Sequence, residues 1–328
     1  MAYWFLAAGI LLLIGGSEAV SRGGVGLARV FGLSPLLIGI IVIAGAASAP
    51  ELCVALSAAT AGAPDIALGD IVGGNILMLL LALGLGALIH PLASPPKVVL
   101  RDGGAMLLAS LAVAFFALGG AISRRDGVIL FLGFVAYTVV TFLTDERRSA
   151  DHSIALSRAL ARSQHEPPPV AGAVFLLLLG LICLVSGALF TVDGSVALAR
   201  ALHLNQAFVA LTLIAFGTSL PKLSATLAAA ALGRTEVAVG QLLGASVFNL
   251  LGALGIAAIV APLKVSPQMA SADIYVMAGA SVLLLPILAM RWKLSRPRGI
   301  LLASCYVCYL VFLVWRQGLL TPALLGIG

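Results

Sequence analysis

The sequence predicts an all-α polytopic membrane protein of ten transmembrane helices, built as two inverted five-helix repeats with both termini outside. Three observations lead to this prediction: the composition, a series of long apolar segments and an internal repeat. Of the 328 residues, 61% are hydrophobic and only 10% are charged, and the mean hydropathy is +1.15. Soluble domains carry about 25% charged residues. The composition therefore excludes a water-soluble enzyme or nucleic-acid binder and makes membrane lipid the expected surroundings.

The apolar segments have the length of membrane helices. A bilayer core about 30 Å thick needs about 20 apolar residues per helix, and long apolar runs are typical of helices rather than of barrel strands. Charges, prolines and glycines separate the ten segments, which are 2–21, 35–60, 66–89, 103–121, 126–144, 170–191, 206–232, 236–261, 273–290 and 299–316.

The most polar segment divides the chain into two halves. It contains four arginines, two histidines and three consecutive prolines, and we interpret it as a cytoplasmic linker at 144–169 between a first repeat at 1–143 and a second at 170–328. With the N-terminus outside, 13 Lys and Arg residues fall in cytoplasmic loops and 5 fall outside. This bias follows the positive-inside rule. It also explains the net charge of +6 without a nucleic-acid partner.

The two halves are related by an offset of 171 residues. Residues 33–92 align with 204–263 without a gap and are identical at 21 of 60 positions. The shared Ser-x-Pro motifs, Ser48-x-Pro50 and Ser219-x-Pro221, and four shared glycines support the alignment more strongly than the apolar identities do. Because each half has an odd number of helices, the second copy must cross the membrane upside down. Inverted repeats of this kind are typical of secondary transporters, which bind their substrate near the membrane midplane.

Pro50 and Pro221 occupy equivalent places inside the second and seventh helices. Proline lacks the amide hydrogen and clashes with the carbonyl four residues earlier, so we expect each helix to be interrupted here. The carbonyls thus freed, around Ala46 and Gly217, need new partners in a membrane. A bound cation could supply one, and so could a neighbouring Ser or Thr. The presence of two such prolines, each beside a charged residue, favours an ion site.

Glu51 and Lys222 directly follow the two prolines and are the clearest charged side chains at membrane depth. Such residues indicate function, and their equivalence in the repeat predicts a direct ion pair. Asp70 is expected near the start of the third helix, where it either faces a vestibule or caps the helix. The other polar candidates for the ion site are Ser48, Thr218, Ser219, Asn75, Ser246 and Asn249.

Four segments resemble the two alpha repeats of the sodium/calcium exchanger superfamily of cation antiporters. They are AASAPE at 46–51, PDIALGDIVGGN at 64–75, GTSLPK at 217–222 and GASVFN at 244–249. The resemblance implies an exchanger fold, a moving first and sixth helix, and ion ligands at Glu51, Ser48, Thr218, Ser219 and Asn249. Of these, Glu51 and Asn249 are the candidate metal ligands.

The sequence departs from the family pattern at several ligand positions. Lys222 stands where the second acid is expected, and the polar ligands are replaced at Ala47, Gly74, Met78 and Ala245. Ca²⁺ takes six to eight oxygen ligands, usually including carboxylates. We therefore expect weak or no Ca²⁺ binding here, with the Lys222 ammonium in the place of a bound cation. A buried lysine can also exchange a proton, which makes proton coupling a further possibility.

Two functional hypotheses follow from these residues. The first is a secondary active cation antiporter with altered ions or coupling, in which H⁺, Na⁺ or Ca²⁺ is transported and no cofactor is required. The second is a transport-silent structural or regulatory protein locked by the Glu51–Lys222 pair. An intramembrane enzyme is disfavoured, because no catalytic set is found at membrane depth. We expect the bacterial inner (plasma) membrane as the location. The sequence does not specify the oligomeric state.

Overall fold

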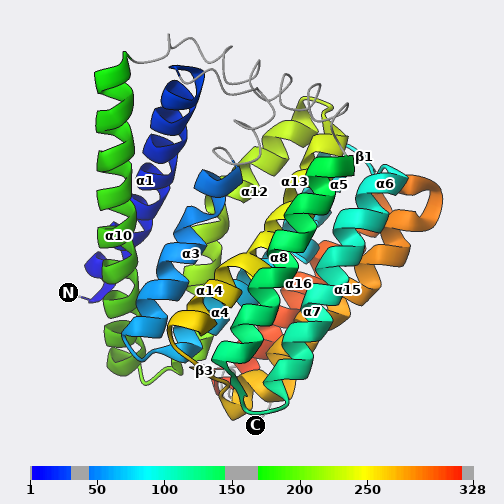
Figure 1. Cartoon of the computed structure of the whole chain (residues 1–328). Coiled ribbons are helices and arrows are strands. Elements are labelled where there is room, and N and C mark those ends of the chain that lie inside the picture. The colour runs from blue at the N-terminus through cyan, green and yellow to red at the C-terminus, as the bar shows by residue number, and fades with distance from the viewer. Residues whose placement is uncertain (1, 31–43, 145–168, 320–328) are drawn as a thin grey trace.

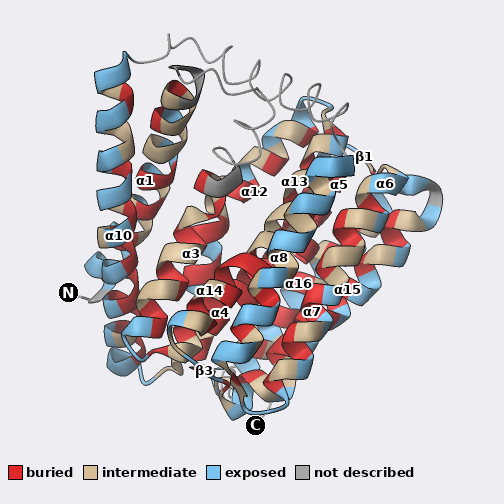
Figure 2. Cartoon of the chain, in the orientation of Figure 1, coloured by how far each residue is buried: buried red, intermediate tan, exposed pale blue. Residues whose placement is uncertain are grey.

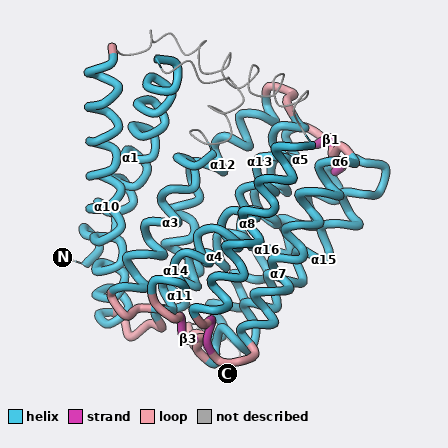
Figure 3. Tube along the Cα trace, viewed as in Figure 1, coloured by secondary structure: helices cyan, strands magenta, loops and turns pink. Residues whose placement is uncertain are grey.

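The computed structural model describes residues 2–30, 44–144 and 169–319, and nearly all of them are helical (Figure 1). Two pairs of very short strands lie at the ends of the bundle (Figure 3). The first half consists of α1(Ala2–Val30), α3(Ala44–Thr60), α4(Pro64–Ile76), η2(Leu77–Ala82), α5(Leu83–Ile89), β1(Leu92–Ala93), α6(Pro96–Val98), η3(Val99–Gly103), α7(Gly104–Ala117), β2(Ala121–Ile122) and α8(Arg124–Thr144). The second half consists of α10(Val170–Ala201), α11(Gln206–Val209), η4(Ala210–Ile214), α12(Ala215–Ala231), α13(Thr235–Val247), η5(Phe248–Ala253), α14(Leu254–Val260), β3(Leu263–Lys264), η6(Met269–Asp273), α15(Ile274–Ala289), η7(Met290–Trp292), β4(Lys293–Leu294) and α16(Arg296–Arg316).

Nine helices within the described residues are long and apolar enough to cross a membrane. They match nine of the predicted segments. The remaining predicted helix, 35–60, lies partly outside the described residues, and its described part is α3. Several of these spans are built from an α-helix, a π-helical turn and a second α-helix that continue one another.

The expected ends of two helices are wrong. The first helix was expected to stop at residue 21, but α1 continues to Val30. The sixth was expected to stop at residue 191, but α10 continues to Ala201. Charged residues were taken as loop signals, yet a helix end can carry charges on an exposed face. Arg22, for example, pairs with Glu18 one turn earlier, at 2.6 Å, as an i,i+4 pair on a helix does.

Equivalent elements in the two halves have the same spacing as the sequence repeat. The bounds of α3 and α12, α4 and α13, η2 and η5, and α5 and α14 all differ by 171 residues. β1 pairs with β4 and β2 pairs with β3, both antiparallel, so each pair joins one half to the other. Ser110 and Ser281, which are 171 residues apart, contact each other directly through their hydroxyls at 2.8 Å. These observations agree with two copies related by a local two-fold axis.

A matched pair of aspartates ties the fourth and fifth helices of each half together. Asp102 accepts a hydrogen bond from Tyr137 at 3.1 Å, and Asp273 accepts one from Tyr309 at 3.0 Å. Asp102 also pairs with Arg101, and Asp273 pairs with Arg316. Because these carboxylates already have cationic partners, we assign them a structural role.

Helices α1 and α10 form a close antiparallel pair at one side of the bundle (Figure 1). Three glycines spaced by seven residues line each contact face: Gly9, Gly16 and Gly23 on α1, and Gly180, Gly187 and Gly194 on α10. A Cβ atom at any of them would come within 3.0 Å of the other helix. Small residues allow membrane helices to pack backbone against backbone, so these glycines let α1 and α10 associate closely.

The buried core lies in the middle of the bundle, around α4 and the helices that cross it (Figure 2). The two extremes are the spans Pro64–Ile89 and Arg124–Thr144. In the most apolar part of the first, 83% of the residues are buried, and in that of the second only 11% are. The first of these helices is therefore surrounded by protein, and the second presents most of its apolar surface outward, as a lipid-facing helix does. The polar candidate residues fall on the central helices.

Candidate functional site

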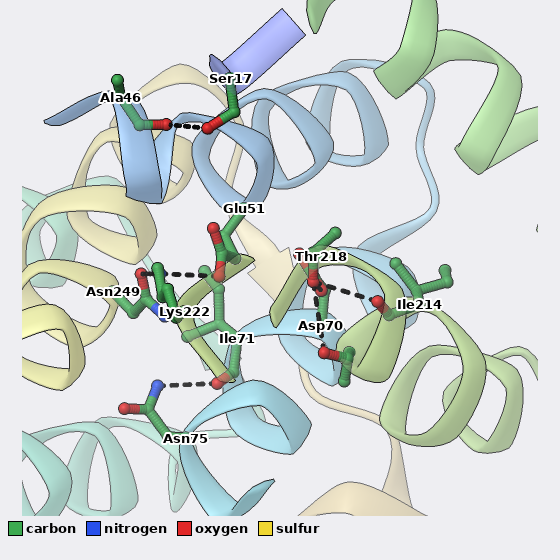
Figure 4. A network of polar contacts seen from close by, with 11 residues as sticks. Ser17, Ala46, Glu51, Asp70, Ile71, Asn75, Ile214, Thr218, Lys222 and Asn249 are labelled. Carbon is green, nitrogen blue, oxygen red and sulfur yellow. Dashed lines mark hydrogen bonds and ion pairs between the residues drawn. The ribbon is translucent and has the colours of Figure 1, made fainter. Parts of the chain in front are cut away.

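The centre of the site is an ion pair between the two halves. Lys222 Nζ on α12 lies 2.7 Å from Glu51 Oε1 on α3, and both side chains are fully buried (Figure 4). The two residues are 171 positions apart, as the repeat requires for residues that meet at its axis. The predicted contact is thus present in the structure. A buried pair of this geometry keeps each charge from being left alone in a low-dielectric interior.

Asn249 and Asn75 flank this pair in different ways. Lys222 Nζ lies 3.4 Å from Asn249 Oδ1, so the ammonium has a second, weaker acceptor on η5. Asn75 instead donates to Ile71 O of its own helix, at 2.7 Å. The structure therefore brings Asn249 into the Glu51–Lys222 contact and directs the amide group of Asn75 toward the α4 backbone.

Asp70 differs from its expected position. It does not open or cap its helix but lies in the middle of α4, fully buried. Its Oδ1 accepts a hydrogen bond from Thr218 Oγ1 of α12 at 2.7 Å (Figure 4). The capping role expected for Asp70 is therefore wrong, because the residue lies well inside α4, and the alternative, that it faces a vestibule, stays a prediction. The carboxylate faces the neighbouring repeat instead.

Several polar oxygens around these residues are buried and have no hydrogen-bond partner within the described residues. Ser48, Ser219 and Ser246 are all at most 2% exposed. Buried polar groups are normally satisfied, and exceptions call for water, an ion or a functional explanation. The unpartnered oxygens are Glu51 Oε2, Asp70 Oδ2, Asn75 Oδ1, Ser219 Oγ and Ser246 Oγ.

Four positions where the resemblance implies oxygen ligands have no polar side chain here, and Ala47 is the first of them. Met78 is buried as an apolar side chain, and Gly74 and Ala245 have no polar side chain. A Cβ atom at Gly74 would lie 3.2 Å from Ser219 Oγ. The replacement by glycine therefore leaves space directly in front of that serine hydroxyl.

The prolines do not interrupt their helices within the described residues. Pro50 lies inside α3 and Pro221 inside α12, and each helix continues past its proline. The helix breaks expected at Pro50 and Pro221 are therefore wrong. Each proline removes one backbone hydrogen bond, and the packing of neighbouring helices holds the chain helical on both sides of it.

The carbonyl freed by Pro50 is satisfied by a side chain that the sequence did not single out. Ser17 Oγ on α1 donates to Ala46 O at 2.7 Å (Figure 4). At the equivalent place in the second half, Gly217 lies against the Ile10 side chain of α1. Of the two partners expected for this carbonyl, a bound cation or a nearby Ser or Thr, the structure shows a serine at Pro50. The serine at position 17 of a largely apolar helix was the available signal, but its partner depends on how the helices pack.

Taken together, the fold and this centre define a polytopic integral membrane protein with a polar, charged site between two structural repeats. The chain belongs to the sodium/calcium exchanger family: the family model described as sodium/calcium exchanger protein matches residues 1–143 and again 172–315. Each half of the chain therefore carries one copy of the family's pattern.

Named relatives and solved structures agree with this assignment. The chain is 31% identical to the putative antiporter CaxA of Alkalimonas amylolytica, over 93% of this chain and 96% of that protein. It is 32% identical to the inner membrane protein YrbG of Escherichia coli, over 98% and 99%. Its fold matches the solved structure of the sodium-calcium exchanger NCX_Mj soaked with Na⁺ and Sr²⁺, with a TM-score of 0.64. The two sequences are 28% identical, and the match covers 94% of this chain and 97% of that one.

Proposed function

We propose that this protein is a secondary active transporter that exchanges cations across the membrane, with Lys222 in the place of one ion-binding carboxylate. The exchanger relatives support the general activity. The observation that carries the specific proposal is the 2.7 Å contact between Lys222 Nζ and Glu51 Oε1. It supports a site in which the Lys222 ammonium neutralises Glu51, the one carboxylate of the family pattern that this chain keeps.

Ca²⁺ is a poor substrate for such a site. Two like unit charges 4 Å apart repel by about 4 kcal/mol at an effective dielectric constant of about 20, and Ca²⁺ carries two. The ammonium of Lys222 would meet any ion that approaches Glu51. We infer that a cation reaches Glu51 only when Lys222 moves away or loses its proton, which would couple cation entry to proton release.

A transport-silent role is the second candidate, and the same contact favours it. A fully buried, well-aligned ion pair between the two repeats could hold them in one arrangement. Such a protein would have a structural or regulatory function. The two candidates differ in ion flux rather than in fold.

We expect purified protein in sealed lipid vesicles to move cations when a pH or Na⁺ gradient is imposed. Flux is followed with a trapped pH dye and with ²²Na⁺, and Lys222→Ala and empty vesicles are measured alongside. The coupled antiporter is supported if the wild type transports cations and if Lys222→Ala changes the pH dependence of that transport. Absence of flux under every gradient, from protein that is folded and correctly inserted, contradicts it and favours the silent role.

A further inference from the structure

The fully buried Asp70 is a carboxylate that the Glu51–Lys222 pair leaves without a counter-ion. Within the described residues no Lys, Arg or His forms an ion pair with it, and its Oδ2 has no partner. The single hydrogen bond to its Oδ1 comes from the neutral Thr218 hydroxyl. A carboxylate in the interior is costly without a cationic partner, so Asp70 has the surroundings of a group that holds a cation.

A second group without a partner lies on the same interface between α4 and α12. Ser219 is fully buried, and its hydroxyl has no hydrogen-bond partner among the described residues. It lies over Gly74, which is one helical turn after Asp70 and on the same face of α4. Because Thr218 and Ser219 are adjacent, the Asp70 carboxylate and the Ser219 hydroxyl approach the same stretch of this interface.

The charges of the whole centre point to an ion of single charge. Glu51 and Asp70 contribute two carboxylates, and Lys222 contributes one ammonium. When all three are ionised, one net negative charge remains. One monovalent cation neutralises it, whereas a divalent ion would leave an excess positive charge at low dielectric.

We propose that Asp70 and Ser219 hold one monovalent cation between α4 and α12, beside the Glu51–Lys222 pair. The equivalent positions in the other repeat are Gln241 and Ser48, and Gln241 carries no charge. The site is therefore present once, on one side of the repeat axis. The proposal rests on the proposed transport function for its biological role, but binding of the ion can be measured without transport.

The test is equilibrium binding of ²²Na⁺ to the full-length protein in detergent, with unlabelled Na⁺, K⁺ and Ca²⁺ as competitors. We expect one saturable site per chain, displaced by a monovalent ion and not by equimolar Ca²⁺. Asp70→Asn keeps an acceptor for Thr218 and removes the charge, so it should weaken binding at least tenfold. Ser219→Ala should weaken it several-fold, and Gln241→Ala is the matched control and should leave it unchanged.

The outcomes separate this site from the transport activity. Saturable binding that depends on Asp70, in a protein that shows no flux, supports the site and contradicts the antiporter. The site is overturned if folded Asp70→Asn and Ser219→Ala proteins bind Na⁺ as tightly as the wild type does. It is also overturned if the wild type shows no saturable binding of a monovalent cation. Where Asp70→Asn does not fold, the Ser219→Ala result decides, because that change removes only an unpartnered hydroxyl.

Discussion

Replacing Lys222 by methionine is expected to destabilise the folded protein by about 3–5 kcal/mol. Methionine has similar length and fills the space, but it removes the only ionic partner that Glu51 has within the described residues. Glu51 would be left as a buried carboxylate without a counter-ion. The loss can be measured as a lower free energy of unfolding in mixed detergent and SDS micelles.

The matched control is the double substitution Glu51→Gln with Lys222→Met. It removes both charges together, and buried ion pairs replaced by neutral groups of similar volume often lose little stability or gain some. We therefore expect the double variant to recover most of what the single variant loses. A Lys222→Met protein within about 1 kcal/mol of the wild type would show that the pair is solvated and would contradict the buried geometry.

Replacing Gly16 by leucine is expected to separate α1 from α10 and to cost about 3 kcal/mol, the upper end of the usual cost of overpacking. A Cβ atom at Gly16 would lie 2.9 Å from the carbonyl oxygen of Gly180 and 3.0 Å from the amide of Leu184. Both are backbone atoms of the facing helix, so no side-chain rotation relieves the clash. The free energy of unfolding, together with cross-linking of cysteines placed on the two helices, measures the effect.

The neighbouring residue provides a control with the same change in volume and hydrophobicity. Gly15 is exposed, and a Cβ atom there would meet no atom within 4 Å. Gly15→Leu should therefore fold and cross-link as the wild type does. Equal stability of the Gly16→Leu and Gly15→Leu proteins would contradict the close backbone contact between α1 and α10.

The repeat made the central contact predictable from the sequence. Glu51 and Lys222 are 171 residues apart and follow equivalent prolines, so the requirement that equivalent residues meet at a common axis was sufficient to pair them. The same reasoning predicted Ser48 and Ser219 beside this pair, and both are buried. Asn249 was suggested by the resemblance to the exchanger family, and its Oδ1 lies 3.4 Å from Lys222 Nζ. The long apolar segments were equally informative, because lipid imposes both the length and the helical form of a span.

The sequence was less informative where a residue's partner depends on helix packing. Asp70 was expected at a helix end, whereas it lies in mid-helix against Thr218, and periodicity alone does not give the rotation of α4 toward α12. Ser17 was not singled out, because its acceptor, the carbonyl of Ala46, is exposed only by Pro50 on another helix. The prolines were expected to break their helices, but α3 and α12 each continue past their proline.

The most direct test of the central claim is the binding of Ca²⁺ to the wild type and to Lys222→Glu, measured with ⁴⁵Ca²⁺ in detergent. The claim is that the Lys222 ammonium occupies the place of a bound cation. It predicts weak or no Ca²⁺ binding to the wild type. Lys222→Glu should bind Ca²⁺ at least about tenfold more tightly, a difference of about 1.4 kcal/mol, and this gain should disappear when Glu51→Gln is added. Tight Ca²⁺ binding by the wild type would contradict the claim, and so would the absence of any gain in Ca²⁺ binding in a folded Lys222→Glu protein.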